Sequence, residues 1–137
     1  MKLLMIYAKR FAYTPTIKTL DEVEEMTEAK SFENCLVGFI QAEAEDEEKP
    51  VLKVEKNLVK NLKWGARKNE TNKIILHSFA HLSGSKASPE FTKEVFDLAE
   101  QRLKNVEFET AQTPFGYFLD LQVEAPGYSQ ARIFRSF

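Results

Sequence analysis

The stretch KIILHSFAHLS (residues 73–83) begins as an apolar strand and ends as a polar loop. A short apolar run such as Ile74-Ile75-Leu76 is typical of a strand that is buried on both faces of a sheet. One helical pattern precedes this stretch and another follows it. Because a buried strand lies between two helices along the chain, the sequence predicts an α/β domain.

Two segments have the spacing of helices. In residues 51–67, apolar side chains gather on one face of a helical wheel, and lysines follow each other at steps of three and four on the opposite face. This helix is expected to stop near Gly65. The second helix begins at Ser88-Pro89-Glu90, where serine caps free amides, proline suits the first position and glutamate complements the helix dipole. Its inner face continues to about Lys104.

Strands are expected at both ends of the chain. A tight charged turn at Lys9-Arg10 joins the first two, and Pro126-Gly127 supplies a turn between the last two. The acidic segment 21–30 is weakly helical and is expected to be a solvated surface excursion. The seven predicted strands are residues 3–8, 10–16, 35–43, 72–78, 106–110, 117–124 and 130–134. Together with two main helices they predict one layered domain with a mixed sheet over residues 1–137.

Composition narrows the classes of function. Of the 137 residues, 43% are hydrophobic and 29% are charged, which is typical of a chain that folds around a packed core. A formal net charge of -2 gives no global attraction to nucleic acid or membranes. The single cysteine, Cys35, excludes an intramolecular disulfide and a multi-cysteine zinc site. No apolar segment has the length of a signal peptide or a membrane span, so a cytoplasmic protein without metal or cofactor is expected.

His81 is the main candidate for chemistry. Ser83 and Ser85 follow it in the loop, which is compatible with a serine nucleophile activated by histidine, although no third group is identifiable. Two further interpretations stay open: a histidine hydrogen-bonded to the loop backbone, and a pocket histidine that orients substrate or water. His77 lies four residues earlier, near the end of a strand, so the two histidines need not face the same way.

Two short motifs point to a family. SFAHLS (residues 78–83) is followed, after a helix, by TPFGYF (residues 113–118). In this order and spacing they resemble the N-terminal editing domain of archaeal threonyl-tRNA synthetases, and the likeness extends over nearly the whole chain. The resemblance implies the layered α/β/β fold of D-aminoacyl-tRNA deacylases and a homodimer. It also implies that the domain binds the aminoacylated 3′ end of tRNA and hydrolyses seryl-tRNA(Thr) made in error.

The resemblance also implies which residues line the cleft. His81 would be the catalytic group that positions water or transfers a proton, while backbone amides stabilise the oxyanion. Phe118 and Arg132 occupy positions where the family has a tyrosine and a glutamate. The implied substrate-binding residues are Ala42, Glu43, Ala44, Phe79, Ala80, His81, Phe115, Gly116, Tyr117, Phe118 and Arg132.

Other polar groups of the family pattern are also replaced in this sequence. Leu119 stands in place of a lysine, and Tyr7-Ala8-Lys9 stands where the family has HSD. Loss of one electrostatic donor typically costs roughly 10² to 10³ in rate. Arg132 in place of a carboxylate should repel the ammonium group of an aminoacyl ester. The sequence therefore supports both a deacylase and a catalytically silent dimeric binding module. A third function, hydrolysis of an unrelated small ester, has no positive feature.

Lysines on the first helix form a candidate surface for nucleic acid. The chain ends directly after the editing-like region, so it is expected to be freestanding and to act in trans, with a synthetase as a further partner. Selection of tRNA would then depend on local positive charge. A solvated helix face is the alternative interpretation, because lysine is common on exposed helix surfaces. The candidate phosphate contacts are Lys53, Lys56, Lys60 and Lys63.

Overall fold

The computed structural model describes all 137 residues. Six strands and two long helices confirm the predicted mixed α/β class, and two short 3₁₀ helices lie at Ala44–Glu48 and Ser129–Ala131. The strands are β1 (Lys2–Lys18), β2 (Lys30–Gln41), β3 (Lys73–Ser78), β4 (Glu109–Gln112), β5 (Tyr117–Glu124) and β6 (Arg132–Ser136), and the helices are α1 (Val51–Lys68) and α2 (Pro89–Asn105).

All six strands belong to one mixed sheet, in the order β4-β3-β2-β1-β5, with β6 also paired to β1. β3 runs parallel to β2 and β4, and the other pairs are antiparallel. The long strand β1 has two partners along one edge, because residues 2–6 pair with β6 and residues 10–18 pair with β5. The two halves of β1 therefore belong to different parts of the sheet.

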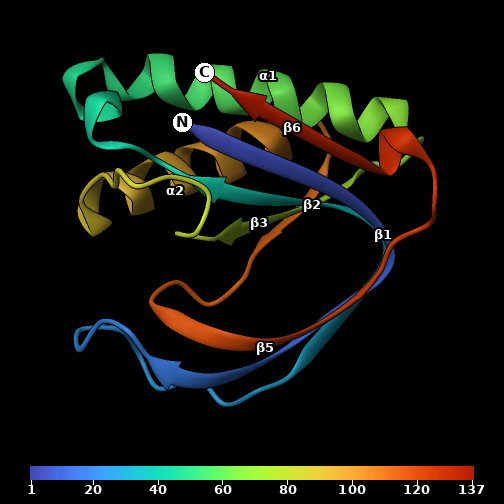
Figure 1. Cartoon of the computed structure of the whole chain (residues 1–137), viewed down its shortest axis with the longest axis horizontal. Coiled ribbons are helices and arrows are strands. Elements are labelled where there is room, and N and C mark those ends of the chain that lie inside the picture. Colours follow the sequence, from blue (N-terminus) through green and yellow to red (C-terminus); the bar gives the residue numbers. More distant parts are fainter.

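The sheet bends so that the fold has three layers. Figure 1 shows α1 and α2 over one face, while the second half of β1 carries β5 back below the opposite face of β2 and β3. We call this lower layer the curled ribbon; it consists of β5, residues 10–18 of β1 and residues 30–33 of β2. The remaining strands and strand segments form the main sheet. Helices, main sheet and curled ribbon give the layered arrangement that the sequence predicts.

Two apolar cores lie on opposite faces of the main sheet. The helix-side core contains 17 buried residues, among them Leu58, Leu62 and Phe96, and joins the helices to the sheet. The ribbon-side core contains only seven, including Phe11 and Phe39. None of the helices combines the length and the apolar character that crossing a membrane requires.

The predicted turn at Lys9-Arg10 is wrong. β1 continues through both residues, with Ala8 opposite Cys35 and Arg10 opposite Glu33. The Lys9 side chain is exposed, so its charge is solvated. The pairing of β1 with β2 skips Lys9 and Asn34, which has a φ of 50°, and resumes at Arg10, so the strand continues. The first two predicted strands are therefore one, and the sheet has six strands rather than seven.

The predicted stop of the first helix near Gly65 is also wrong, because α1 continues to Lys68. Gly65 lies where the helix backbone is close to the sheet. A Cβ atom there would lie 2.7 Å from the Met5 sulfur and 3.1 Å from a methyl group of Leu36. The glycine is thus a packing requirement inside the helix, and Asn69 follows α1 as its C-cap.

Other strand boundaries also differ from the sequence prediction. β2 runs from Lys30 to Gln41, whereas the sequence predicts residues 35–43. β4 begins at Glu109 rather than residue 106, because the chain turns at Glu107 with a φ of 69°. The last strand begins at Arg132, after a short 3₁₀ helix that occupies the predicted start. Residues 21–29 form turns and irregular chain without a helix, and they are mostly exposed, as expected for a surface excursion.

Candidate functional site

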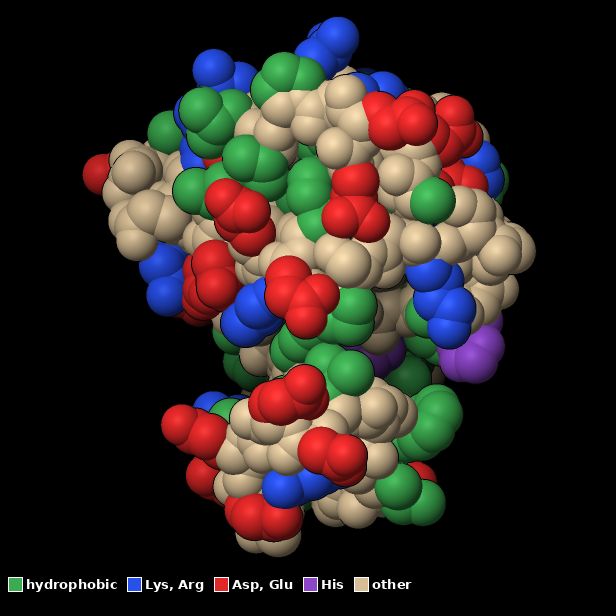
Figure 2. Space-filling model, turned by 90° about the vertical axis from the view of Figure 1, so that its left-hand side faces the viewer, with side chains coloured by type: hydrophobic (Ala, Val, Ile, Leu, Met, Phe, Trp, Pro, Cys, Tyr) green, Lys and Arg blue, Asp and Glu red, His purple; other side chains and the backbone are tan.

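A cavity of about 400 Å³ lies between the main sheet and the curled ribbon. Residues 77–81 at the end of β3 form one wall, and residues 114–119 at the start of β5 form the opposite wall. The start of α2 closes one side through Pro89 and Thr92. Figure 2 shows the hollow between the two parts of the molecule, with histidine at its rim. A cavity of this size is in the range of small-ligand sites.

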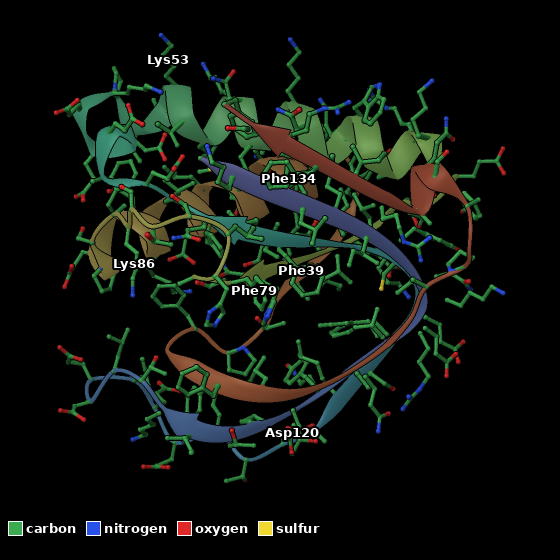
Figure 3. All side chains as sticks on the ribbon, in the orientation of Figure 1. Phe39, Lys53, Phe79, Lys86, Asp120 and Phe134 are labelled. Atoms are coloured by element: carbon green, nitrogen blue, oxygen red, sulfur yellow. The ribbon has the colours of Figure 1, made fainter.

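The fold brings together most of the residues that the sequence assigned to substrate binding. They come from the end of β2, the loop after β3 and the start of β5, which are far apart in the sequence. Figure 3 shows Phe79 pointing from the main sheet toward the curled ribbon. The predicted residues that line the cavity are Ala42, Phe79, Ala80, His81, Phe115, Gly116, Tyr117 and Phe118.

Three predicted substrate-binding residues do not line the cavity. The Glu43 carboxylate points to the N-terminal ammonium of Met1, 2.8 Å away. Ala44 is exposed, and its amide donates to the Ser85 hydroxyl at 2.9 Å. Arg132 is exposed at the start of β6. Arg132 therefore lies outside the lining of the cavity.

The loop serines do not orient His81. The Ser83 hydroxyl donates to Glu43 at 2.7 Å, and the Ser85 hydroxyl accepts from the Ala44 amide. No hydrogen bond joins either hydroxyl to His81, so the serine–histidine pair considered from the sequence does not form. The exposed His81 ring instead packs edge-on against Phe79, with ring centroids 4.9 Å apart.

His77 faces the same cavity from a deeper position, and its side chain is 5% exposed. Its Nδ1 lies 2.9 Å from the Thr113 hydroxyl. Burial lowers the pKa of His77 to about 4, so the ring is neutral at physiological pH. His77 and Phe79 lie side by side, with ring centroids 5.9 Å apart, and the His81 ring follows Phe79 on the same wall of the cavity.

Gln41 holds the loop that carries His81. Its amide nitrogen donates to the carbonyls of Ser83 and Ser85, at 3.0 and 2.8 Å. Its amide oxygen accepts from the backbone amides of Leu82 and Ser83, at 2.7 and 2.8 Å. With all four bonds made by one buried side chain, the loop is fixed to the end of β2. The wall of the cavity is thereby positioned by a residue outside both motifs.

A buried charge cluster supports the loop that carries His81. The Met1 ammonium contacts the carboxylates of Glu43 and Asp46, at 2.8 and 3.2 Å. Hydrogen bonds from this ammonium and from the Ser83 hydroxyl lower the pKa of Glu43 to about 2. The carboxylate therefore stays ionised and keeps Ser83 in place at every pH near neutrality.

The opposite wall is shaped by the PFGY segment. Gly116 has a φ of 83°, and a Cβ atom there would come within 2.8 Å of a Val23 methyl group. The Tyr117 hydroxyl donates to the Glu24 carbonyl and accepts from the Met26 amide. Both residues thus attach the excursion between β1 and β2 to the cavity wall, and the phenol is committed to that structural role.

Comparison with known proteins assigns the chain to a family. A model of the archaea-specific editing domain of threonyl-tRNA synthetase matches residues 1–137. The chain belongs to this family. It is 30% identical over 143 residues to a threonine–tRNA ligase of Hyperthermus butylicus, and 33% identical over 132 residues to one of Staphylothermus marinus. These matches cover 100% and 93% of the chain but only 23% and 21% of the relatives.

The editing domain also resembles a solved structure. The c-Myc DNA Unwinding Element Binding Protein matches 100% of the chain, and the match covers 99% of that structure, with a TM-score of 0.65 and 14% identity. At this identity the likeness concerns the fold alone. The layered α/β/β fold of the D-aminoacyl-tRNA deacylase type, implied by the sequence motifs, is confirmed.

The cavity of this editing domain has little charge. Lys86 is the only charged side chain in its lining, and no carboxylate lines it. Leu119 and Leu121 form an apolar part of the ribbon wall and pack against the ribbon-side core. Their alternation with exposed Asp120 and Gln122 is the strand pattern that the sequence indicates.

The lysines predicted to contact nucleic acid lie on α1, on the opposite side of the main sheet from the cavity. Figure 3 shows Lys53 pointing away from the sheet. Lys53, Lys56 and Lys60 are exposed and Lys63 is half-buried. The only acidic residue of α1, Glu55, is buried and accepts from Arg102 of α2 at 2.7 Å. The outer face of α1 is therefore basic without exposed carboxylates of its own.

Sequence reasoning missed Gln41, Lys86 and Thr113, and set His77 aside. A signal existed for two of them, because Gln41 and His77 are polar residues inside runs that otherwise predict buried strands. Such residues need a hydrogen-bond partner when they are buried. Lys86 carried no signal, since an exposed lysine in a loop is ordinary.

Proposed function

We propose that this editing domain binds the aminoacylated 3′ end of tRNA in the cavity and hydrolyses a mischarged ester, with seryl-tRNA(Thr) as the substrate. The observation that carries the proposal is the set of unpaired backbone amides at the cavity. No acceptor in the protein pairs with the amides of Ala80, His81, Phe115 or Gly116, which come from the two facing walls. Free amides are suited to bind the polar groups of an aminoacyl-adenosine and to stabilise an oxyanion.

The reaction needs a water molecule and a proton shuttle. Water attacks the ester carbonyl carbon, the bond to the ribose oxygen breaks, and the ribose oxygen receives a proton. His81 is exposed at the rim of the cavity and has no hydrogen-bond partner in the protein, so its ring is free to position that water or carry the proton. Lys86 supplies the one positive charge that can neutralise a phosphate of the terminal nucleotide.

A catalytically silent binding module is the second candidate. The observation in its favour is the apolar wall at Phe118 and Leu119, where the family pattern has a tyrosine and a lysine. The hydroxyl of Tyr117 offers no substitute, because the excursion between β1 and β2 occupies it. If the module is silent, the wild type releases no amino acid, and Leu119→Lys is the variant that restores hydrolysis.

Deacylation of seryl-tRNA(Thr) and threonyl-tRNA(Thr) by purified protein tests the proposal. Binding of a non-hydrolysable 3′-seryl-amide of adenosine is measured alongside. Hydrolysis of the seryl ester supports a deacylase, binding without hydrolysis supports the silent module, and absence of both overturns the assignment to the tRNA 3′ end. His81→Ala is expected to weaken binding or abolish hydrolysis while the melting temperature changes little, because an exposed ring leaves no core cavity.

The basic face of α1 is a second contact with tRNA in this proposal. Lys53, Lys56, Lys60 and Lys63 follow the helix surface and would neutralise phosphates, so the affinity should fall steeply with salt. The quadruple change to Glu is expected to abolish tRNA binding and its salt dependence. Two double variants with the same change in charge serve as test and control. Lys56→Glu/Lys60→Glu on α1 should weaken tRNA binding, and Lys9→Glu/Lys30→Glu, outside α1, should leave it unchanged. If the two double variants change tRNA affinity equally, the α1 lysines are a solvated helix face and not a tRNA contact.

A homodimer is the proposed assembly. Ile17 and Phe118 are opposite each other in the ribbon and are 65% and 56% exposed. Such an exposed apolar pair is a candidate contact between copies, and Phe118 also lines the cavity. Light scattering at micromolar concentration should give twice the monomer mass of 15.8 kDa, and a mass of 15.8 kDa alone would refute the dimer. We further place the protein in the cytoplasm, where its tRNA substrate occurs.

A further inference from the structure

We propose that His77, held by Thr113, recognises a hydroxyl group of the bound ligand at the inner end of the cavity. The inference rests on the proposed function, since the ligand is taken to be an aminoacyl-adenosine. It adds a specificity-determining residue that belongs to neither sequence motif. The hydroxyl can belong to the aminoacyl side chain or to the ribose, and the experiment below distinguishes these two sources.

The position of the ring supports this role. Three aromatic rings surround His77, with centroids 6.3 Å (Phe11), 5.1 Å (Phe39) and 5.9 Å (Phe79) away. These rings fix the orientation of the imidazole and offer it no hydrogen-bond partner. Nδ1 is occupied by Thr113, whereas Nε2 has no partner in the protein. Because no buried side-chain nitrogen or oxygen lacks a partner, Nε2 must reach the cavity that His77 lines.

The chemistry of the pair explains why the ligand group is a hydroxyl. The ring is neutral at physiological pH, so it offers one nitrogen–hydrogen donor and one acceptor rather than a charge. When the Thr113 hydroxyl donates to Nδ1, Nε2 carries the proton and donates to the ligand. When the Thr113 hydroxyl instead accepts from Nδ1, Nε2 carries no proton and accepts from the ligand. A hydroxyl satisfies both states, whereas an ammonium group can only donate.

The absence of charge around the pair favours a neutral ligand group. Lys86 is the only charged side chain in the cavity lining, and burial alone accounts for the lowered pKa of His77. A ligand lacking the hydroxyl would leave Nε2 desolvated and unpaired, which disfavours that ligand. The expected discrimination for one neutral hydrogen bond is roughly 3- to 10-fold in affinity.

The experiment compares three non-hydrolysable ligands: the 3′-seryl-amide of adenosine, its alanyl counterpart and the 2′-deoxy form of the seryl compound. Wild-type protein should bind one of the two hydroxyl-deficient ligands roughly 3- to 10-fold more weakly than the complete ligand. Weaker binding of the alanyl form assigns the hydroxyl to the amino acid, and weaker binding of the deoxy form assigns it to the ribose. Equal affinity for all three overturns the inference.

Variants separate recognition from mere structural support. His77→Phe keeps a planar ring and should equalise the three affinities. His81→Phe, at the rim, should change all three affinities alike and keep their ratio. Thr113→Val should reduce the discrimination and Thr113→Ser should retain it, because the hydroxyl bonded to Nδ1 holds the ring with Nε2 toward the cavity. Discrimination that persists in a folded His77→Phe variant overturns the inference.

A last measurement does not depend on tRNA chemistry. In protein labelled with ¹⁵N at histidine, addition of propan-2-ol should shift the Nε2 resonance of His77, whereas propane-saturated buffer should not. If no adenosine ligand binds but the alcohol shifts this resonance, the proposed function fails and the hydroxyl site stands. If the alcohol produces no shift at His77, the hydroxyl site is refuted whether or not the adenosine ligands bind.

Discussion

The two faces of the main sheet are covered in different ways. On the helix side, α1 and α2 lie along the sheet and close a core of 17 buried residues that is mostly aliphatic. On the ribbon side, the sheet covers itself by bending, and only seven buried residues fill the space between. The remaining space is the cavity, which His77 and Phe79 line, while Phe11 and Phe39 pack against the His77 ring from the core.

This contrast indicates where a binding site can form in a small domain. Two helices provide many apolar side chains and join a core of 17 buried residues, so the helix side stabilises the fold. A single curled ribbon cannot do so along its full length, and the unfilled end is open to a ligand. The buried polar groups are also divided: Glu55 bonds to Arg102 within the helix layer, whereas His77 keeps one nitrogen free at the cavity.

The largest difference between the two faces should appear in truncation of leucines. Leu62 is fully buried between α1 and the sheet, so Leu62→Ala is expected to lower the free energy of unfolding by about 2–5 kcal/mol. Leu119 is half-buried at the cavity, and Leu119→Ala should cost only about 1 kcal/mol because it enlarges a space that already exists. Urea unfolding of both variants measures the two losses. Equal losses would mean that the ribbon side is packed as tightly as the helix side.

Acid should destabilise the protein in two different pH windows, one set by His77 and the other by Glu43. The pKa of His77 is about 4 in the folded protein and about 6.5 when unfolded, so between these values the unfolded chain binds more protons. The free energy of unfolding therefore falls as pH drops through this window, by on the order of 3 kcal/mol. The pKa of Glu43 falls from 4.5 to about 2 on folding, so the stability that it contributes is present above pH 4.5 and is lost below it.

Unfolding free energies of the wild type and of two variants measure these windows. His77→Phe should remove the pH dependence between about 6.5 and 4 that burial of this ring causes. Glu43→Gln should change the dependence only below pH 4.5. An unchanged slope above pH 4.5 in His77→Phe would contradict the assignment of a buried neutral ring.

The smallest expected effect is at the start of α2, where the two regions meet. The Ser88 hydroxyl accepts from the Phe91 amide at 3.2 Å, and Pro89 and Thr92 of the same turn line the cavity. Ser88→Ala should cost about 1 kcal/mol, and Ser88→Thr, which keeps a hydroxyl for the cap, should retain most of the stability. The melting temperatures of the two variants report the difference. Because the Ser88 hydroxyl also donates to the Glu47 carboxylate at 3.0 Å, Glu47→Gln is the control. A loss in Ser88→Thr as large as in Ser88→Ala would contradict the capping role.

Elements with a local physical cause are predictable from the amino-acid sequence alone. The helical spacing predicts α1 from its first residue, and Ser88-Pro89 predicts the start of α2, because capping and periodicity act over a few neighbouring residues. The limits of β5 are also predicted correctly. The motifs SFAHLS and TPFGYF point to the correct family. The fold places these two motifs on the two facing walls of the cavity.

Features that depend on contacts between distant segments became apparent only in the folded structure. Gly65 looked like a helix stop and is instead the point where α1 approaches Met5. Lys9-Arg10 looked like a turn because two charges rarely continue a buried strand, yet β1 continues through both residues and the Lys9 charge is solvated. Gln41 and His77 gain their roles from Ser83 and Thr113, which lie 42 and 36 residues away. Local sequence patterns do not predict such partners, because a buried polar group forms its hydrogen bond with whichever chain segment the fold places beside it.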